Sequence, residues 1–284
     1  MELEYPAPPS TALPTMYDLP EEEIGQPGMP DLFHEWQGRL LDETFKPPGF
    51  QPEEVFSAVD MNLYYDVKHF KWHKRPDWFA VVGLPQEKHP GMRLSYVMWQ
   101  ENVIPLVVVE LLSPSTRKDD LGTRLRDVDG SPTKWDVYEQ WVGVPYYVTF
   151  DRRNDDWQIF TLNGSRYQKV EPTDGRFWIE EAELWLGLWH GSWLGETRQW
   201  LRWYDRQGNL IPTAAERVQQ ERIHAQQEYE RAEQAHERAE QAHERAEQAH
   251  ERAEREKSER EAVQQRAALL AEKLRALGVD PDQI

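Results

Sequence analysis

Two acidic residues stand against apolar runs, where a carboxylate is costly to bury. Asp77 precedes the apolar residues 78–84, and Glu110 lies inside the apolar run 106–112. The second run is typical of a strand that is buried on both faces, and a carboxylate there needs a partner. Two such acids at the ends of neighbouring strands can hold a divalent cation. The pattern therefore indicates metal-dependent cleavage of a phosphodiester bond.

This chemistry requires charge neutralisation at the phosphate and an activated water, and Mg²⁺ can supply both. Mg²⁺ prefers oxygen ligands and keeps several of its waters, so two carboxylates and one main-chain carbonyl suffice. Asp77, Glu110 and the carbonyl of Leu111 provide such a set if the two strands are neighbours. We therefore expect Mg²⁺ as the cofactor, with Mn²⁺ as the alternative. A nearby lysine would orient the water.

The surrounding pattern predicts elements that could position these residues. Asp31 is a suitable cap for a helix whose apolar face contains Leu32, Phe33, Trp36, Leu40 and Leu41. Strands are expected over residues 55–65, 78–84, 104–112 and 144–150, and a second helix over 133–142 with Thr133 as its cap. Asn163-Gly164 predicts a hairpin between strands 157–162 and 167–170. Residues 46–52 and 117–132 are interpreted as loops. This order predicts an α/β fold with a mixed central sheet flanked by helices.

Composition divides the 284 residues into three parts. Residues 1–30 are rich in proline and acids and predict an extended arm. All thirteen tryptophans lie between Trp36 and Trp203, so the globular domain is expected over residues 31–212. The Trp-rich stretch 183–204 is interpreted as a cover for the sheet, with base stacking as the alternative. Residues 213–284 predict a helical, coiled-coil-like tail.

The formal net charge of −18 is unusual for a protein that binds nucleic acid. Residues 1–60 contribute −11 and residues 214–284 contribute −5, whereas residues 61–213 carry 21 acids and 19 bases. Most of the acidity therefore lies outside the candidate site, although no basic patch is evident. The chain has no cysteine, no signal peptide and no membrane-spanning apolar run, so we expect a cytoplasmic protein without a membrane partner.

The tail contains a true internal repeat. The sequence Glu-Arg-Ala-Glu-Gln-Ala-His occurs three times between Glu230 and His250, and its alanines alternate in steps of three and four. This spacing is a heptad seam, and Val263, Ala267, Leu270, Leu274 and Leu277 resume the same frame. The seam predicts a homo-oligomer held mainly by its leucine end. A solvated single helix is the equally open alternative.

Several motifs resemble the Uma-two family, a family of restriction-endonuclease type within the PD-(D/E)XK nuclease superfamily. They are Pro76-Asp77, the string from Val109 to Thr116, Lys134 to Tyr138, Gly143 to Tyr147, and Leu186-Gly187-Leu188-Trp189. The resemblance covers roughly residues 30–212. It implies a restriction-endonuclease-like fold and Mg²⁺-dependent hydrolysis of DNA that leaves a 5′-phosphate and a 3′-hydroxyl.

By this resemblance, Asp77 and Glu110 match the metal-binding acids of the superfamily. The superfamily's lysine belongs two places after the second acid, but that position is Leu112. Lys134, with Tyr138 four residues later, fits a lysine moved into the following helix, and Arg124 is the rival. Lys134 is favoured because an arginine cannot readily replace a lysine in activating water. His34 and Glu35 could face the site as additional helical groups, although an ordinary surface pair is the simpler interpretation.

The sequence thus favours a metal-dependent DNA endonuclease with Asp77, Glu110, Lys134 and Tyr138 as catalytic residues. The first alternative is a catalytically silent scaffold that associates through its heptad helix, and the acidic balance favours it. The second alternative is a metal-dependent hydrolase that acts on RNA or a nucleotide.

Overall fold

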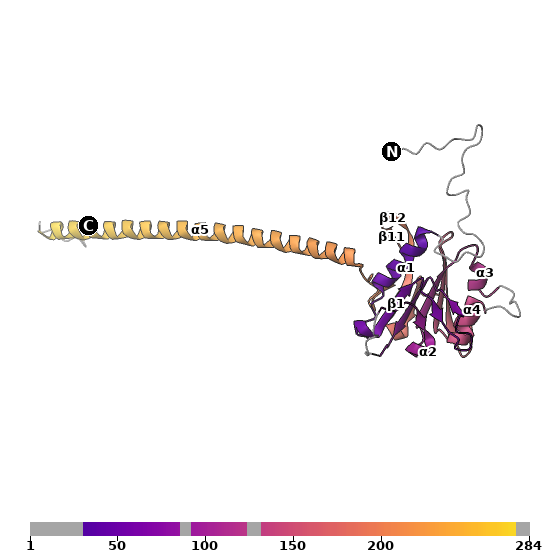
Figure 1. The fold of residues 1–284 in the computed structure, drawn as a ribbon. Coiled ribbons are helices and arrows are strands. Elements are labelled where there is room, and N and C mark those ends of the chain that lie inside the picture. Colours follow the sequence, from indigo (N-terminus) through magenta and orange to yellow (C-terminus); the bar gives the residue numbers. More distant parts are fainter. Residues whose placement is uncertain (1–30, 86–91, 124–131, 277–284) are drawn as a thin grey trace, which may run out of the picture. The chain divides into compact units, whose positions relative to one another are not determined.

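A six-stranded mixed sheet forms the centre of the fold (Figure 1), in a computed structural model that describes residues 31–85, 92–123 and 132–276. Its strand order is β1-β4-β6-β7-β8-β9. These strands are β1 (Val55–Val59), β4 (Trp78–Val82), β6 (Val107–Leu111), β7 (Tyr146–Asp151), β8 (Asp156–Asn163) and β9 (Arg166–Val170). β6 and β7 pair in parallel, and the other neighbours in this sheet are antiparallel. The predicted α/β class with a mixed central sheet is confirmed.

Two smaller sheets and several short helices complete the domain. One sheet has the order β3-β2-β5, from β3 (His73–Lys74), β2 (Leu63–Tyr64) and β5 (Tyr96–Val97). The other has the order β10-β11-β12, from β10 (Arg176–Ile179), β11 (Leu184–Trp193) and β12 (Glu196–Tyr204). The helices are α1 (Leu32–Thr44), η1 (Pro52–Glu54), α2 (Met98–Glu101), α3 (Arg117–Asp120), α4 (Lys134–Asp136), the π-helix η2 (Val137–Val142) and η3 (Glu180–Ala182).

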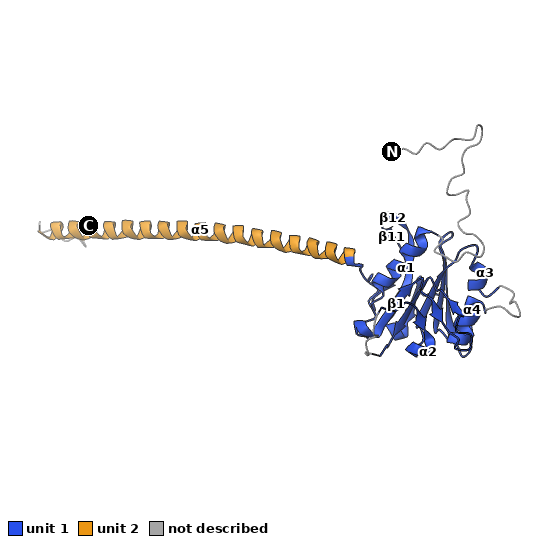
Figure 2. Cartoon of the chain, viewed as in Figure 1, with its two compact units in different colours: residues 1–214 blue, residues 215–284 orange. Residues whose placement is uncertain are grey.

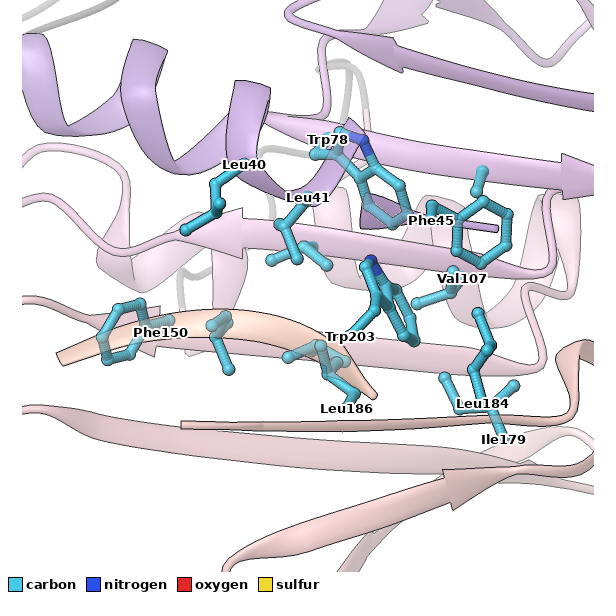
Figure 3. Close-up of a cluster of buried hydrophobic side chains, with 14 of the residues drawn as sticks. Leu40, Leu41, Phe45, Trp78, Val107, Phe150, Ile179, Leu184, Leu186 and Trp203 are labelled. Atoms are coloured by element: carbon cyan, nitrogen blue, oxygen red, sulfur yellow. The ribbon is translucent and has the colours of Figure 1, made fainter. Parts of the chain in front are cut away.

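Helix α1 begins where the sequence predicts, because the Asp31 side chain accepts a hydrogen bond from the His34 amide. Its apolar face packs into a core on one side of the central sheet, except for Leu32, which is 61% exposed. Figure 3 shows Leu40 and Leu41 of α1 beside Trp78 and Trp203, which come from β4 and β12. The Trp-rich stretch therefore covers this face of the sheet, as the simpler interpretation expects.

Strand β6 is buried along its whole length, as its apolar run predicts. Val107, Val109 and Leu111 belong to the core beneath α1, whereas Val108 belongs to a second core that includes Tyr138 of η2. Alternate side chains of a strand point to opposite faces. Glu110 therefore points to the same face as Val108, toward η2.

Two local predictions are wrong. The strand expected over residues 55–65 is split into β1 and β2, and Asp60 between them has a positive φ of 50°. Residues 117–132 are not entirely a loop, because residues 117–120 form helix α3. The predicted arm at residues 1–30 lies outside the described residues.

The chain divides into two compact units, residues 1–214 and 215–284, which are coloured separately in Figure 2. The described part of the second unit lies in helix α5 (Ala214–Ala276), a 63-residue helix with no buried residue. The long C-terminal helix is therefore confirmed, while its heptad pairing stays a prediction. Within the described ranges, no helix combines the length and apolar character that crossing a membrane requires.

Candidate active site

Antiparallel pairing of β4 and β6 brings the two predicted acids together. Trp78 pairs with Val109, and one further step of this register sets Asp77 opposite Glu110. The Asp77 amide donates to Glu110 Oε2 at 3.4 Å, and the Leu111 amide donates to Asp77 Oδ2 at 2.6 Å. The two acids therefore meet at one end of a pair of neighbouring buried strands.

Glu110 has no exposed surface. Both of its carboxylate oxygens have partners on the continuous helix formed by α4 and η2. Lys134 Nζ donates to Oε2 at 2.7 Å, and the Tyr138 hydroxyl donates to Oε1 at 2.8 Å. Such bonds to a buried charge are strong. Lys134 and Tyr138, four residues apart, are thus directed at the same carboxylate from one face of a helix.

The start of that helix is fixed by two side chains. Thr133 caps it by accepting a hydrogen bond from the Asp136 amide at 3.1 Å, as its sequence position predicts. The Lys134 amide donates to Asp119 Oδ2 at 3.1 Å, which ties the helix to α3. The Tyr138 side chain leaves from the π-helical turn η2, and single π-helical turns inside helices are frequent at functional sites.

Asp120 is a third acid beside Lys134 that the sequence did not single out. It is fully buried, and its Oδ1 lies 3.4 Å from Lys134 Nζ. Its only sequence signal was its position four residues before the rival Arg124. Arg124 itself lies outside the described residues.

Burial and mutual charge set the ionisation of this cluster. Burial raises the pKa of Glu110 to about 7 and that of Asp120 to about 7, against the lowering effect of Lys134. Burial likewise raises the pKa of Asp77. For Lys134, burial alone would lower the pKa, but the carboxylates of Asp120, Glu110 and Asp77 raise it well above its usual value. The amine is therefore a permanent cation and hydrogen-bond donor.

Helix α1 contributes a contact from the other side of the sheet through His34, one of the two helical residues that could face the site. His34 Nε2 lies 3.0 Å from the carbonyl oxygen of Leu111, and Nδ1 lies 2.9 Å from Asp31 Oδ1. His34 is buried, so the interpretation as a surface residue is wrong for it. Glu35 is partly exposed and 4.0 Å from Arg39, as an ordinary surface pair would be.

The donor set fits a divalent cation. Asp77, Glu110 and Asp120 supply three carboxylates against the single amine of Lys134, so the cluster has an excess of negative charge when ionised. The Leu111 carbonyl retains a second lone pair beside its bond to His34. Among the described residues, no three His, Asp or Glu side chains are grouped as a metal-binding cluster.

A mixed sheet with acids on adjacent strands and a lysine directed at one of them is typical of metal-dependent nucleases. The chain belongs to the Uma2 family, which is described as "Putative restriction endonuclease" and whose model matches residues 5–194. This membership indicates nuclease activity, and nucleases of the restriction type generally use divalent metals and act on DNA. No curated protein matches the chain.

Proposed function

We propose that the protein is a divalent-metal-dependent endonuclease that hydrolyses phosphodiester bonds in DNA. The observation that carries the proposal is the buried Glu110 carboxylate, held by Lys134 and Tyr138 and paired across the sheet with Asp77. A fully buried carboxylate with a raised pKa is costly for stability, and such groups cluster at functional sites. Family membership supports the nuclease class.

Each group has a role that follows from its contacts. Asp77, Glu110 and the Leu111 carbonyl would hold Mg²⁺ or Mn²⁺, which supplies charge neutralisation at the phosphate and a more acidic water. Lys134 stays protonated, so it donates hydrogen bonds to the attacking water or the phosphate and stabilises developing negative charge. Tyr138 fixes the orientation of the Glu110 carboxylate through its bond to Oε1.

The direct test is cleavage of supercoiled plasmid and of single-stranded DNA with Mg²⁺ or Mn²⁺. Wild type is compared with Glu110→Gln, which keeps the size of the side chain, and with Glu181→Gln at an exposed glutamate. We expect cutting by wild type and by Glu181→Gln, and a loss of at least about a hundredfold in Glu110→Gln. Equal cutting by a folded Glu110→Gln protein would remove Glu110 from the site and contradict the proposal.

A second function, association through α5, is supported by its exposed apolar side chains. Three large apolar side chains of α5 are 56–67% exposed, namely Val263, Leu269 and Leu270. A helix usually buries such side chains against another part of a protein. We propose that α5 forms homo-oligomers through the seam that contains Leu270 and Leu274. This association is compatible with an active or a silent nuclease domain.

A further inference from the structure

The loop between β2 and β3, together with β3, is rich in basic residues. Charge totals over long segments do not show this local excess. Residues 67–75 read Val-Lys-His-Phe-Lys-Trp-His-Lys-Arg, with four basic residues, two histidines, two aromatic residues and no acid. We call this segment the basic turn. The charge totals for residues 61–213 give no sign of a basic patch, whereas the basic turn is a short basic segment within them.

Phe70 of the basic turn and Trp141 of η2 are exposed aromatic side chains. Phe70 is 66% exposed, and the Trp72 ring stacks on His69 with centroids 4.0 Å apart. Trp141 of η2 is 43% exposed and contacts Trp72 edge-on at 6.4 Å. Phe70 and Trp141 are thus exposed rings on which unpaired bases could stack, whereas Trp72 is half-buried against the second core.

Two positive charges of the basic turn, those of Lys68 and Lys71, remain available to a ligand. Lys68 and Lys71 are exposed and make no ion pair with the part of the chain that the structure describes. The adjacent acids are already engaged: Asp66 accepts from His69 Nδ1 at 2.6 Å, and Asp60 pairs with Arg75. The surface therefore combines unneutralised cations with exposed rings.

This surface adjoins the candidate active site along two stretches of chain. Arg75 is two residues before Asp77, a separation of at most about 7 Å. Trp141 lies on η2, three residues after Tyr138, whose hydroxyl bonds the Glu110 carboxylate. A nucleic-acid strand bound to the basic turn would therefore be within reach of Asp77 and Glu110. Binding such a strand is a function that this surface could serve.

We infer that the basic turn, together with Trp141, is a docking surface for single-stranded DNA that leads the strand toward Asp77 and Glu110. The choice of DNA rests on the proposed function. A protein partner is disfavoured because an acidic chain places here two exposed lysines, Lys68 and Lys71, near the exposed ring of Phe70 in the sequence. A duplex is disfavoured because its bases are already stacked, so rings such as Phe70 have no free base face to contact.

Binding can be measured without cleavage by fluorescence anisotropy of labelled oligo(dT) of about 20 nucleotides in EDTA. We expect Phe70→Ala and Phe70→Leu to weaken binding about tenfold and Phe70→Trp to keep it, since stacking needs a ring. Lys68→Ala/Lys71→Ala should reduce the slope of log affinity against log salt by about 1.4, or about 0.7 for each lost phosphate contact.

Matched controls separate this surface from general effects of charge and ring removal. Lys169→Ala/Lys257→Ala removes two exposed lysines elsewhere, and Tyr229→Ala removes an exposed ring on α5. Both should bind like wild type. Binding by the Phe70 and Lys68/Lys71 variants that equals wild type would overturn the inference, and so would tighter binding of duplex DNA or of oligo(U).

The two proposals fail in different ways. If Phe70→Ala loses binding in EDTA while no DNA is cut by wild type, the docking surface stands and the nuclease proposal falls. If Phe70→Ala binds and cuts single strands like wild type while Glu110→Gln is inactive, the nuclease stands and the docking surface falls.

Discussion

A carboxylate as deeply buried as that of Glu110 reduces the stability of the metal-free protein wherever it is ionised. Burial raises its pKa from 4.5 to about 7, so the folded state holds its proton longer than the unfolded chain does. Stability from this group is therefore greatest below the unfolded pKa and falls as pH rises toward about 7. Asp120 contributes in the same direction, because burial raises its pKa as well.

The first prediction is that Glu110→Gln becomes increasingly more stable than wild type as pH rises. Between about pH 5 and about pH 8, the difference in unfolding free energy should grow by on the order of 3 kcal/mol. Urea denaturation in EDTA across this range measures it. Glu181→Gln, at an exposed carboxylate, is the control and should run parallel to wild type. Parallel curves for Glu110→Gln would show that Glu110 is not the destabilising group.

The second prediction concerns the cation itself. A metal binds the ionised carboxylates and must displace any proton held by Glu110, so its affinity should rise with pH through the pKa of about 7. Mn²⁺ at about 1 mM should therefore raise the melting temperature more at about pH 8 than at about pH 6. Thermal denaturation with and without Mn²⁺ measures this effect. An equal shift in Glu110→Gln would indicate that the ion binds elsewhere.

At the scale of elements, one side chain joins helix α1 to the edge of a sheet. Gln37 has no exposed surface, and its side-chain amide bonds both main-chain groups of Leu201 in β12, each at 2.9 Å. Because β12 lies at the edge of its sheet, no other strand of the described residues is paired with it on that side. The Gln37 side chain instead satisfies the amide and carbonyl of Leu201. This contact helps to hold α1, which positions His34 against the Leu111 carbonyl.

The third prediction is that Gln37→Leu destabilises the protein by about 2–4 kcal/mol, because it leaves a buried amide and a buried carbonyl unpaired. Urea denaturation at a fixed pH measures the loss. Gln168→Leu, at an exposed glutamine of β9, should change stability by less than about 0.5 kcal/mol. A loss in Gln37→Leu no larger than in this control would mean that water or another group satisfies Leu201.

The elements that sequence could predict are those fixed by local signals. The Asp31 cap, the Asn163-Gly164 hairpin and the buried run of β6 each lie within a few residues of the structure they determine. Asp120 was not predicted and His34 was only an alternative, because their partners Lys134 and Leu111 are 14 and 77 residues away. Such contacts depend on how helices dock on the sheet, which periodicity alone does not encode.

At the scale of the whole molecule, the nuclease-like unit and helix α5 pose separate questions. The Ala-rich repeat favours helix strongly, but alanines bury little area, so pairing through it would be weak. Neighbouring His236 and Glu240, and likewise His243 and Glu247, lie 3.5 and 4.0 Å apart along the exposed helix. Such exposed pairs add little to stability. Any strong association must therefore come from the Leu-containing end.

The fourth prediction uses the heptad frame to separate an association seam from mere apolarity. Leu270 lies in the frame, whereas its neighbour Leu269 lies one position outside it, and the two are almost equally exposed at 56% and 57%. If α5 pairs through the seam, Leu270→Lys places a charge inside the contact and should shift the full-length protein to monomer. Leu269→Lys adds the same charge on the outer face and should leave the oligomer intact. Sedimentation velocity over a range of concentrations distinguishes the two variants. Equal dissociation by both would exclude the predicted frame, and a monomeric wild type would establish α5 as a solvated single helix.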